Sequence, residues 1–147
     1  MKTRLQLRAE DAEDIAVISA CLQDGLITFA DMEYLVDEQR FVLVVNRFCW
    51  ECGAAADGPA KDAFMRVNSG LCFDTVTDVH LRNLDRKDRS RVLELLAVTA
   101  EDGHIDLLFA ERGRVRLEVT RVSCHMQDLD EPWPTRRRPR HRVAEAS

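Results

Sequence analysis

The sequence predicts an α+β domain in which one N-terminal amphipathic helix packs on an antiparallel sheet. Three observations predict it: an apolar stripe at helical spacing early in the chain, alternating apolar residues after residue 25, and short turns between successive segments. Six or seven strands connected in this way are expected to form a strongly curled sheet or a small open barrel. A pleckstrin-homology-like barrel is one architecture with that strand count.

The helix is expected over residues 11–24. Asp11 can accept a hydrogen bond from the first turn, and Gly25 suits the position that follows a helix. The apolar face of the helix is formed by Ile15, Ile18 and Leu22. Because only one face is apolar, the helix is expected to lie on the sheet.

The rest of the domain, up to residue 130, is expected to consist mainly of strands. Residues 51–69 are the exception, and we expect a loop there, with one helical turn near residues 60–64. Segment 121–130 fits both a helix and a strand, and we favour a strand that continues beyond Val119. The other expected strands are 5–8, 26–36 with an irregularity near Ala30, a central strand over 40–50, 71–81 with a bend, 92–99, 105–109 and 115–119.

Charge divides the chain into two parts. The whole chain carries −5, but residues 131–147 contain five arginines and two glutamates, a net +3, which leaves −8 on the remainder. An acidic body repels nucleic acid at long range, which argues against a general nucleic-acid-binding face on residues 1–130. We expect the Pro/Arg-rich segment 131–147 to be a tail that is either disordered or docked on a surface.

No catalytic, cofactor or metal motif is recognised, and we expect none of these sites. Cys49 and Cys52 form a CxxC pair, which is half of a zinc site. Cys72, Cys124 and His125 would complete that site only if the fold brought them together. With five cysteines at irregular spacing and no apolar signal sequence, we expect free thiols that pack as small hydrophobic groups.

Two functional hypotheses follow from the sequence. In the first, a non-enzymatic binding or scaffold module contacts a protein or RNA partner through the tail, by Trp133, Arg136, Arg137, Arg138 and His141. In the alternative, a small-molecule ligand-binding protein or enzyme has its site at the mouth of the curled sheet, near Asn46, Arg47, Trp50 and Asp128.

The expected environment is the cytoplasm, without membrane contact. The longest apolar run, Phe41 to Val45, is far too short to cross a bilayer. A homodimer is compatible with an exposed edge strand, but the sequence does not indicate one.

Short motifs spread along nearly the whole chain resemble a known family. They are Leu22-Gln23-Asp24, Arg40-Phe41, Asn46-Arg47-Phe48 with Trp50, Gly70-Leu71 with Phe73 and Val76, Leu95-Leu96-Ala97, Leu107 with Phe109-Ala110, Val115 to Val119, Asp128-Leu129 with Pro132-Trp133 and Thr135, and Pro139 with His141. In this order they resemble small alphaproteobacterial proteins of a domain-of-unknown-function family, number 2948. The resemblance implies no activity. It does not require cysteine at 49 or 52, and it includes Trp133 and His141, which implies that the tail is part of the family's design.

Overall fold

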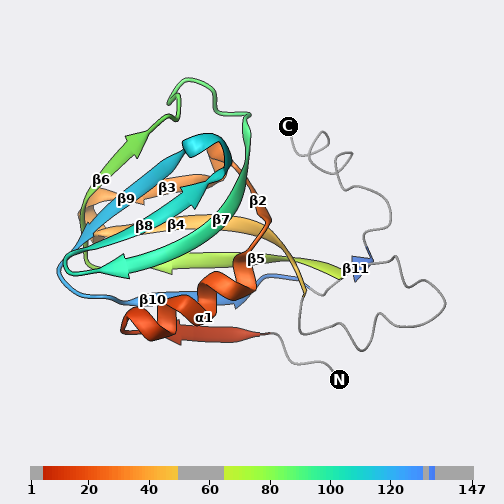
Figure 1. Cartoon of the computed structure of the whole chain (residues 1–147), viewed down its shortest axis with the longest axis horizontal. Coiled ribbons are helices and arrows are strands. Elements are labelled where there is room, and N and C mark those ends of the chain that lie inside the picture. Colours follow the sequence, from red (N-terminus) through yellow and green to blue (C-terminus); the bar gives the residue numbers. More distant parts are fainter. Residues whose placement is uncertain (1–4, 50–64, 131–132, 135–147) are drawn as a thin grey trace.

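One helix lies against a large antiparallel sheet in the computed structural model, which describes residues 5–49, 65–130 and 133–134 (Figure 1). The helix is α1 (Ala12–Leu22), and every strand pairing among the described residues is antiparallel. The predicted α+β class is therefore confirmed. No helix in the described part of the chain is long and apolar enough to cross a membrane.

The described strands number eleven and form one open sheet. Their order is β1-β10-β5-β4-β2-β7-β8-β9-β6, with β3 added beside β4 and β11 beside β5. The prediction of six or seven strands in a strongly curled sheet or a small open barrel was therefore wrong. The pleckstrin-homology-like arrangement is not confirmed. The strands are β1 (Gln6–Ala9), β2 (Gly25–Thr28), β3 (Met32–Leu35), β4 (Arg40–Phe48), β5 (Met65–Phe73), β6 (Val76–Arg82), β7 (Val92–Glu101), β8 (His104–Phe109), β9 (Arg114–Val119), β10 (Cys124–Asp128) and β11 (Trp133–Pro134).

The helix forms where the sequence predicts it. The Asp11 carboxylate accepts a hydrogen bond from the Asp14 backbone N–H at 2.8 Å, which caps the first turn. Ile15, Ile18 and Leu22 are buried, so the predicted apolar face is the one that joins the core. Figure 1 shows α1 lying across the sheet beside β1. The helix also contacts β7, whose Val98 N–H donates to Ser19 Oγ at 2.9 Å.

The end of the helix differs from the prediction. Asp24 adopts the left-handed backbone conformation, with φ 65°, whereas Gly25 is already the first residue of β2. Gly25 is required for a different reason, because a Cβ there would lie 2.6 Å from Val45 Cγ1 and 2.9 Å from the Leu22 carbonyl oxygen. The glycine thus allows β2 to pass close to β4.

The irregularity expected near Ala30 is a 3₁₀ turn, Phe29–Asp31. It divides the single strand expected over 26–36 into β2, which pairs with β7 and β4, and β3, which pairs with β4. The meander β7–β8–β9 is confirmed, with Gly103 at φ 82° in its first turn.

Two expected segments are rearranged by long-range pairing. The bent strand expected over 71–81 is two strands, because β5 pairs with β4 and β10 whereas β6 pairs with β9. Residues 65–69, expected in a loop, belong to β5. The expected helical turn at 60–64 lies outside the described residues.

The strand favoured over 121–130 is confirmed as β10, but it does not continue β9. It lies between β1 and β5, toward the opposite end of the strand order from β9. Regular structure also extends past residue 132, because the backbone of β11 pairs with β5. The remainder of the tail, residues 135–147, lies outside the described residues.

The alternation of β4, β5 and β10 defines two faces that matter for function. Phe41, Leu43 and Val45 point to the buried side, which we call the inner face. Val42, Val44 and Asn46 point to the other side, the outer face, and are half-buried. Inner-face residues from both ends of the strand order join the apolar face of α1 in a single core.

Candidate functional site

A buried arginine network occupies one end of the inner face. Arg47 on β4 has no exposed surface. It is a charged residue that follows three apolar residues on the inner face of its strand. Its Nε donates to Ser69 Oγ on β5 at 2.9 Å, and its Nη2 donates to both carboxylate oxygens of Asp128 on β10 at 3.0 and 3.1 Å. Ser69 Oγ donates to Asp128 Oδ1 at 2.6 Å, which closes a three-membered network.

The strand register brings these three residues together. Ser69 is paired with both Val45 and Asp128, and Arg47 follows one inner-face step beyond Val45. The Asp128 carboxylate also accepts a hydrogen bond from the Leu5 N–H at 3.3 Å, which adds the beginning of β1 to the network. Burying a guanidinium is costly unless a carboxylate compensates it, so the pair favours the register in which β4, β5 and β10 bring Arg47 and Asp128 together.

A second polar group lies beside the first, on the outer face. Arg66 on β5 is 5% exposed, and its Nη2 donates to the Asn46 carbonyl oxygen at 2.8 Å while its Nε donates to Asn46 Oδ1. Its guanidinium lies 4.0 Å from the centroid of the Phe48 ring, a cation–π contact. Burial lowers the pKa of Arg66.

This outer-face group continues toward the end of the described domain. Asn46 Nδ2 donates to Asn68 Oδ1 at 3.2 Å, and Asn68 Nδ2 donates to Asp130 Oδ2 at 3.0 Å. The Asn68 N–H donates to the other oxygen of Asp130 at 3.1 Å. Each of these side chains is therefore fixed by neighbours within the fold.

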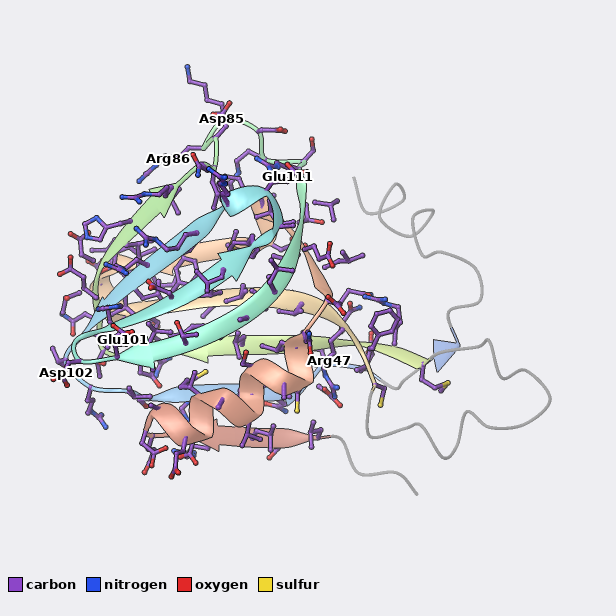
Figure 2. All side chains as sticks on the ribbon, in the orientation of Figure 1. Arg47, Asp85, Arg86, Glu101, Asp102 and Glu111 are labelled. Atoms are coloured by element: carbon purple, nitrogen blue, oxygen red, sulfur yellow. The ribbon has the colours of Figure 1, made fainter. Side chains whose placement is uncertain are left out.

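The structure joins two of the predicted site residues, Arg47 and Asp128, on the inner face, whereas Asn46 points to the outer face and contacts Arg66 and Asn68. Figure 2 shows Arg47 within the body of the domain, whereas the labelled Arg86 and Asp102 lie at turns. The backbone of Trp133 pairs opposite Arg66. Trp50, Arg136, Arg137, Arg138 and His141 lie outside the described residues.

Several members of the two networks were not predicted: Arg66, Asn68, Ser69 and Asp130. One signal for Ser69 was available, since it precedes Leu71 and Phe73 on the apolar side of an alternating strand. Arg66 and Asn68 become neighbours of Asn46 only through the pairing of β4 with β5. Asp130 joins them because it follows the end of β10.

A different cluster lies on the outer face, toward the other end of β5. His125 Nδ1 is 3.4 Å from Asp74 Oδ2, and Cys72 Sγ is 3.9 Å from Asp74 Oδ1. Arg40 Nε donates to Asp74 Oδ1 at 2.8 Å. Burial and the Asp74 charge raise the pKa of the Cys72 thiol, although Arg40 opposes this, so the thiol is protonated at neutral pH.

The cysteines differ from the prediction in one respect. Cys49 is disulfide-bonded, so the prediction of a free thiol was wrong there. Cys72 and His125 do meet, but Cys72 is paired with Val42, at the opposite end of β4 from Cys49. Cys124 points into the core instead. Among the described residues, no site joins Cys49 to these three.

The fold and these contacts define an α+β protein built on an open antiparallel sheet, with a buried arginine–serine–aspartate network across three strands. The chain belongs to the family of proteins of unknown function DUF2948, whose model matches residues 5–141. That range extends beyond β11 and includes the arginine-rich part of the tail. No curated protein and no solved structure matches the chain.

Proposed function

We propose that the protein is a non-enzymatic binding module that contacts a partner protein through the arginine-rich segment after β11. The pairing of β11 with β5 supports this proposal, because Trp133 lies opposite Arg66 and Pro134 opposite Met65. The segment thus departs from a defined point of the sheet. The family match, which continues to residue 141, also supports a role for this segment.

Charge favours an acidic protein surface as the partner. Five arginines give residues 131–147 a net +3, and arginine binds carboxylates through two parallel hydrogen bonds. RNA also binds such segments, but the −8 carried by the remainder of the chain would repel a phosphate backbone nearby. An acidic protein segment does not carry a charge at every unit, as an RNA backbone does, so the acidic domain would repel it less while the arginines bind its carboxylates.

The alternative, a small-molecule site near Arg47, Trp50 and Asp128, has less support from the described contacts. The Arg47 guanidinium is buried and already donates to Ser69, Asp128 and the Phe48 carbonyl oxygen. A ligand would have to displace these contacts before it reached the positive charge.

The experiment compares two triple variants that remove equal charge. One changes Arg136, Arg137 and Arg138 to glutamine. The control changes Arg82, Arg86 and Lys87, which are exposed on and after β6, to glutamine. Each tagged chain is used to capture partners from cell extract with and without ribonuclease, and captured proteins are quantified by mass spectrometry.

The proposal expects the control to retain the partners of the unmodified chain and the tail variant to lose them, with or without ribonuclease. The loss should be reproduced by raising the salt concentration, since the contacts are ionic. Equal capture by both variants would reject the tail as the contact. Capture that disappears after ribonuclease treatment would reject a protein partner in favour of RNA.

A further inference from the structure

Cys72, Asp74 and His125 present one sulfur, one oxygen and one nitrogen ligand atom at a single point on the outer face. These atoms all lie within 4.8 Å of one another, and each side chain is half-buried. We propose that the three residues bind a divalent metal ion of the zinc class. The Cys72 thiol, which is protonated without a metal, releases its proton to solvent as the sulfur binds the ion. Sulfur and imidazole donors favour such an ion over Mg²⁺ or Ca²⁺, which prefer oxygen ligands alone.

The backbone holds the three residues in place without a metal. Cys72 and His125 are directly paired across the antiparallel strands β5 and β10, so their side chains lie side by side on the outer face. Asp74 follows β5 immediately, and its N–H donates to the Ser123 carbonyl oxygen at 2.8 Å. The Ser123 hydroxyl lies 3.4 Å from Asp74 Oδ2, which supports the orientation of the carboxylate.

The observed separations are close to those that a tetrahedral ion requires. Zinc–ligand bonds of about 2.0 Å to nitrogen or oxygen and about 2.3 Å to sulfur place N and O about 3.3 Å apart and S and O about 3.5 Å apart. His125 Nδ1 lies 3.4 Å from Asp74 Oδ2, and Cys72 Sγ lies 3.9 Å from Asp74 Oδ1, the other oxygen of the same carboxylate. Turning the Asp74 carboxylate so that one of its oxygens faces both partners would complete the coordination, and a fourth position would remain for water.

Arg40 is the competitor that this site must overcome. Its Nε donates to Asp74 Oδ1 at 2.8 Å, and Arg8 on β1 is paired with His125, so two cations lie near the ligands. The Arg40 side chain is 51% exposed, and its Nη1 lies 3.5 Å from Glu38 Oε1, which offers it a second partner. Arg40 can therefore turn from Asp74 toward Glu38 when an ion binds, and removing its charge should strengthen metal binding.

Cobalt(II) provides the test, because a cobalt–thiolate bond produces a charge-transfer absorption that no oxygen or nitrogen ligand gives. Cobalt chloride is titrated into the full chain without reductant, so that the disulfide at Cys49 stays intact. Circular dichroism checks that each variant is folded. The variants are Cys72→Ser, His125→Gln, Arg40→Gln and, as the matched control, Cys21→Ser, which removes the half-buried α1 cysteine that lies outside any disulfide.

The proposal expects the band in the unmodified chain and in Cys21→Ser, with one ion per chain, and its displacement by one equivalent of zinc. Cys72→Ser should lose the band, His125→Gln should weaken binding on the order of tenfold or more, and Arg40→Gln should strengthen it. The exposed group of Asp78, His80 and Glu118 contains no sulfur, so metal bound there cannot produce this signal. Absence of the band in the unmodified chain, or a band that persists in Cys72→Ser, would overturn the proposal.

Discussion

Arg47 and Asp128 form a buried ion pair although 81 residues separate them along the chain. Arg47 Nη2 lies 3.0 Å from Asp128 Oδ1, and the two side chains are 0% and 5% exposed. Ser69 connects them through hydrogen bonds to both. The pair therefore makes the register of β4, β5 and β10 interdependent.

Changing Asp128 to alanine is expected to destabilise the protein by about 3–5 kcal/mol, because the guanidinium of Arg47 would stay buried without that carboxylate. Urea unfolding followed by circular dichroism measures the loss. The control is Glu111→Ala, which removes the partner of Arg91 from an ion pair in which Glu111 is 80% exposed. That change is expected to cost less than about 1 kcal/mol. Equal losses in the two variants would contradict the structural importance of the buried pair.

Gly25→Ala is expected to destabilise the protein by about 1–3 kcal/mol, because the new methyl group would meet Val45 and the Leu22 carbonyl within the core. Gly70→Ala is the matched control. There the nearest atom is Leu129 Cδ2 at 3.3 Å, on a side chain that is 48% exposed and can move. Thermal unfolding should show a clearly larger decrease in Tm for Gly25→Ala, and the reverse order would show that β2 tolerates a side chain there.

Asp106 should make stability depend on pH through Arg116. Burial alone would raise the pKa of Asp106, but the hydrogen bonds and charge of Arg116 outweigh it, so the pKa in the folded state is lowered. A lowered folded-state pKa stabilises the protein above the unfolded-state value, and this contribution is lost as pH falls through the folded-state value. Arg116→Gln should therefore reduce the free energy of unfolding at pH 7, and the difference should shrink in acid. Urea unfolding at several pH values measures this, and a deficit that persists undiminished in acid would count against the ion pair.

Thiol labelling should distinguish Cys124 from Cys72. Cys124 lies in the core, where burial strongly raises the pKa of its thiol, while Cys72 is half-buried on the outer face. Iodoacetamide should label Cys72 slowly in the folded protein and Cys124 only after denaturant is added. Peptide mapping by mass spectrometry measures both rates, and equal labelling of the two in native conditions would place Cys124 at the surface.

Local patterns predicted the elements whose partners are adjacent in the sequence. Alternating apolar residues and short turns predict the meander from Val92 to Val119. Apolar residues at helical spacing predict the helix capped by Asp11. The break between β5 and β6 was interpreted as a bend, because alternation alone does not show that two adjacent strands pair with distant parts of a sheet.

The candidate site shows the same limit. Arg47 interrupts an apolar strand, so the sequence indicates it, and Asp128 is predicted beside it, but Ser69 and the outer-face group are not predicted. Cys72 and His125 have no recognisable ligand spacing, since strand pairing alone brings them together. Gly25 was assigned to a helix cap, whereas Asp24 takes the left-handed conformation and close packing selects the glycine.

The pairing of β1 with β10 has a consequence for biosynthesis. During translation β1 and α1 are made before the rest of the sheet, yet the strand that lies between β1 and β5 is among the last of the sheet to be made. Until β10 emerges, β1 has no strand to pair with and one edge of β5 is without its partner. The nascent chain is therefore expected to depend on a holding chaperone, and slow synthesis of its last third should increase misfolding.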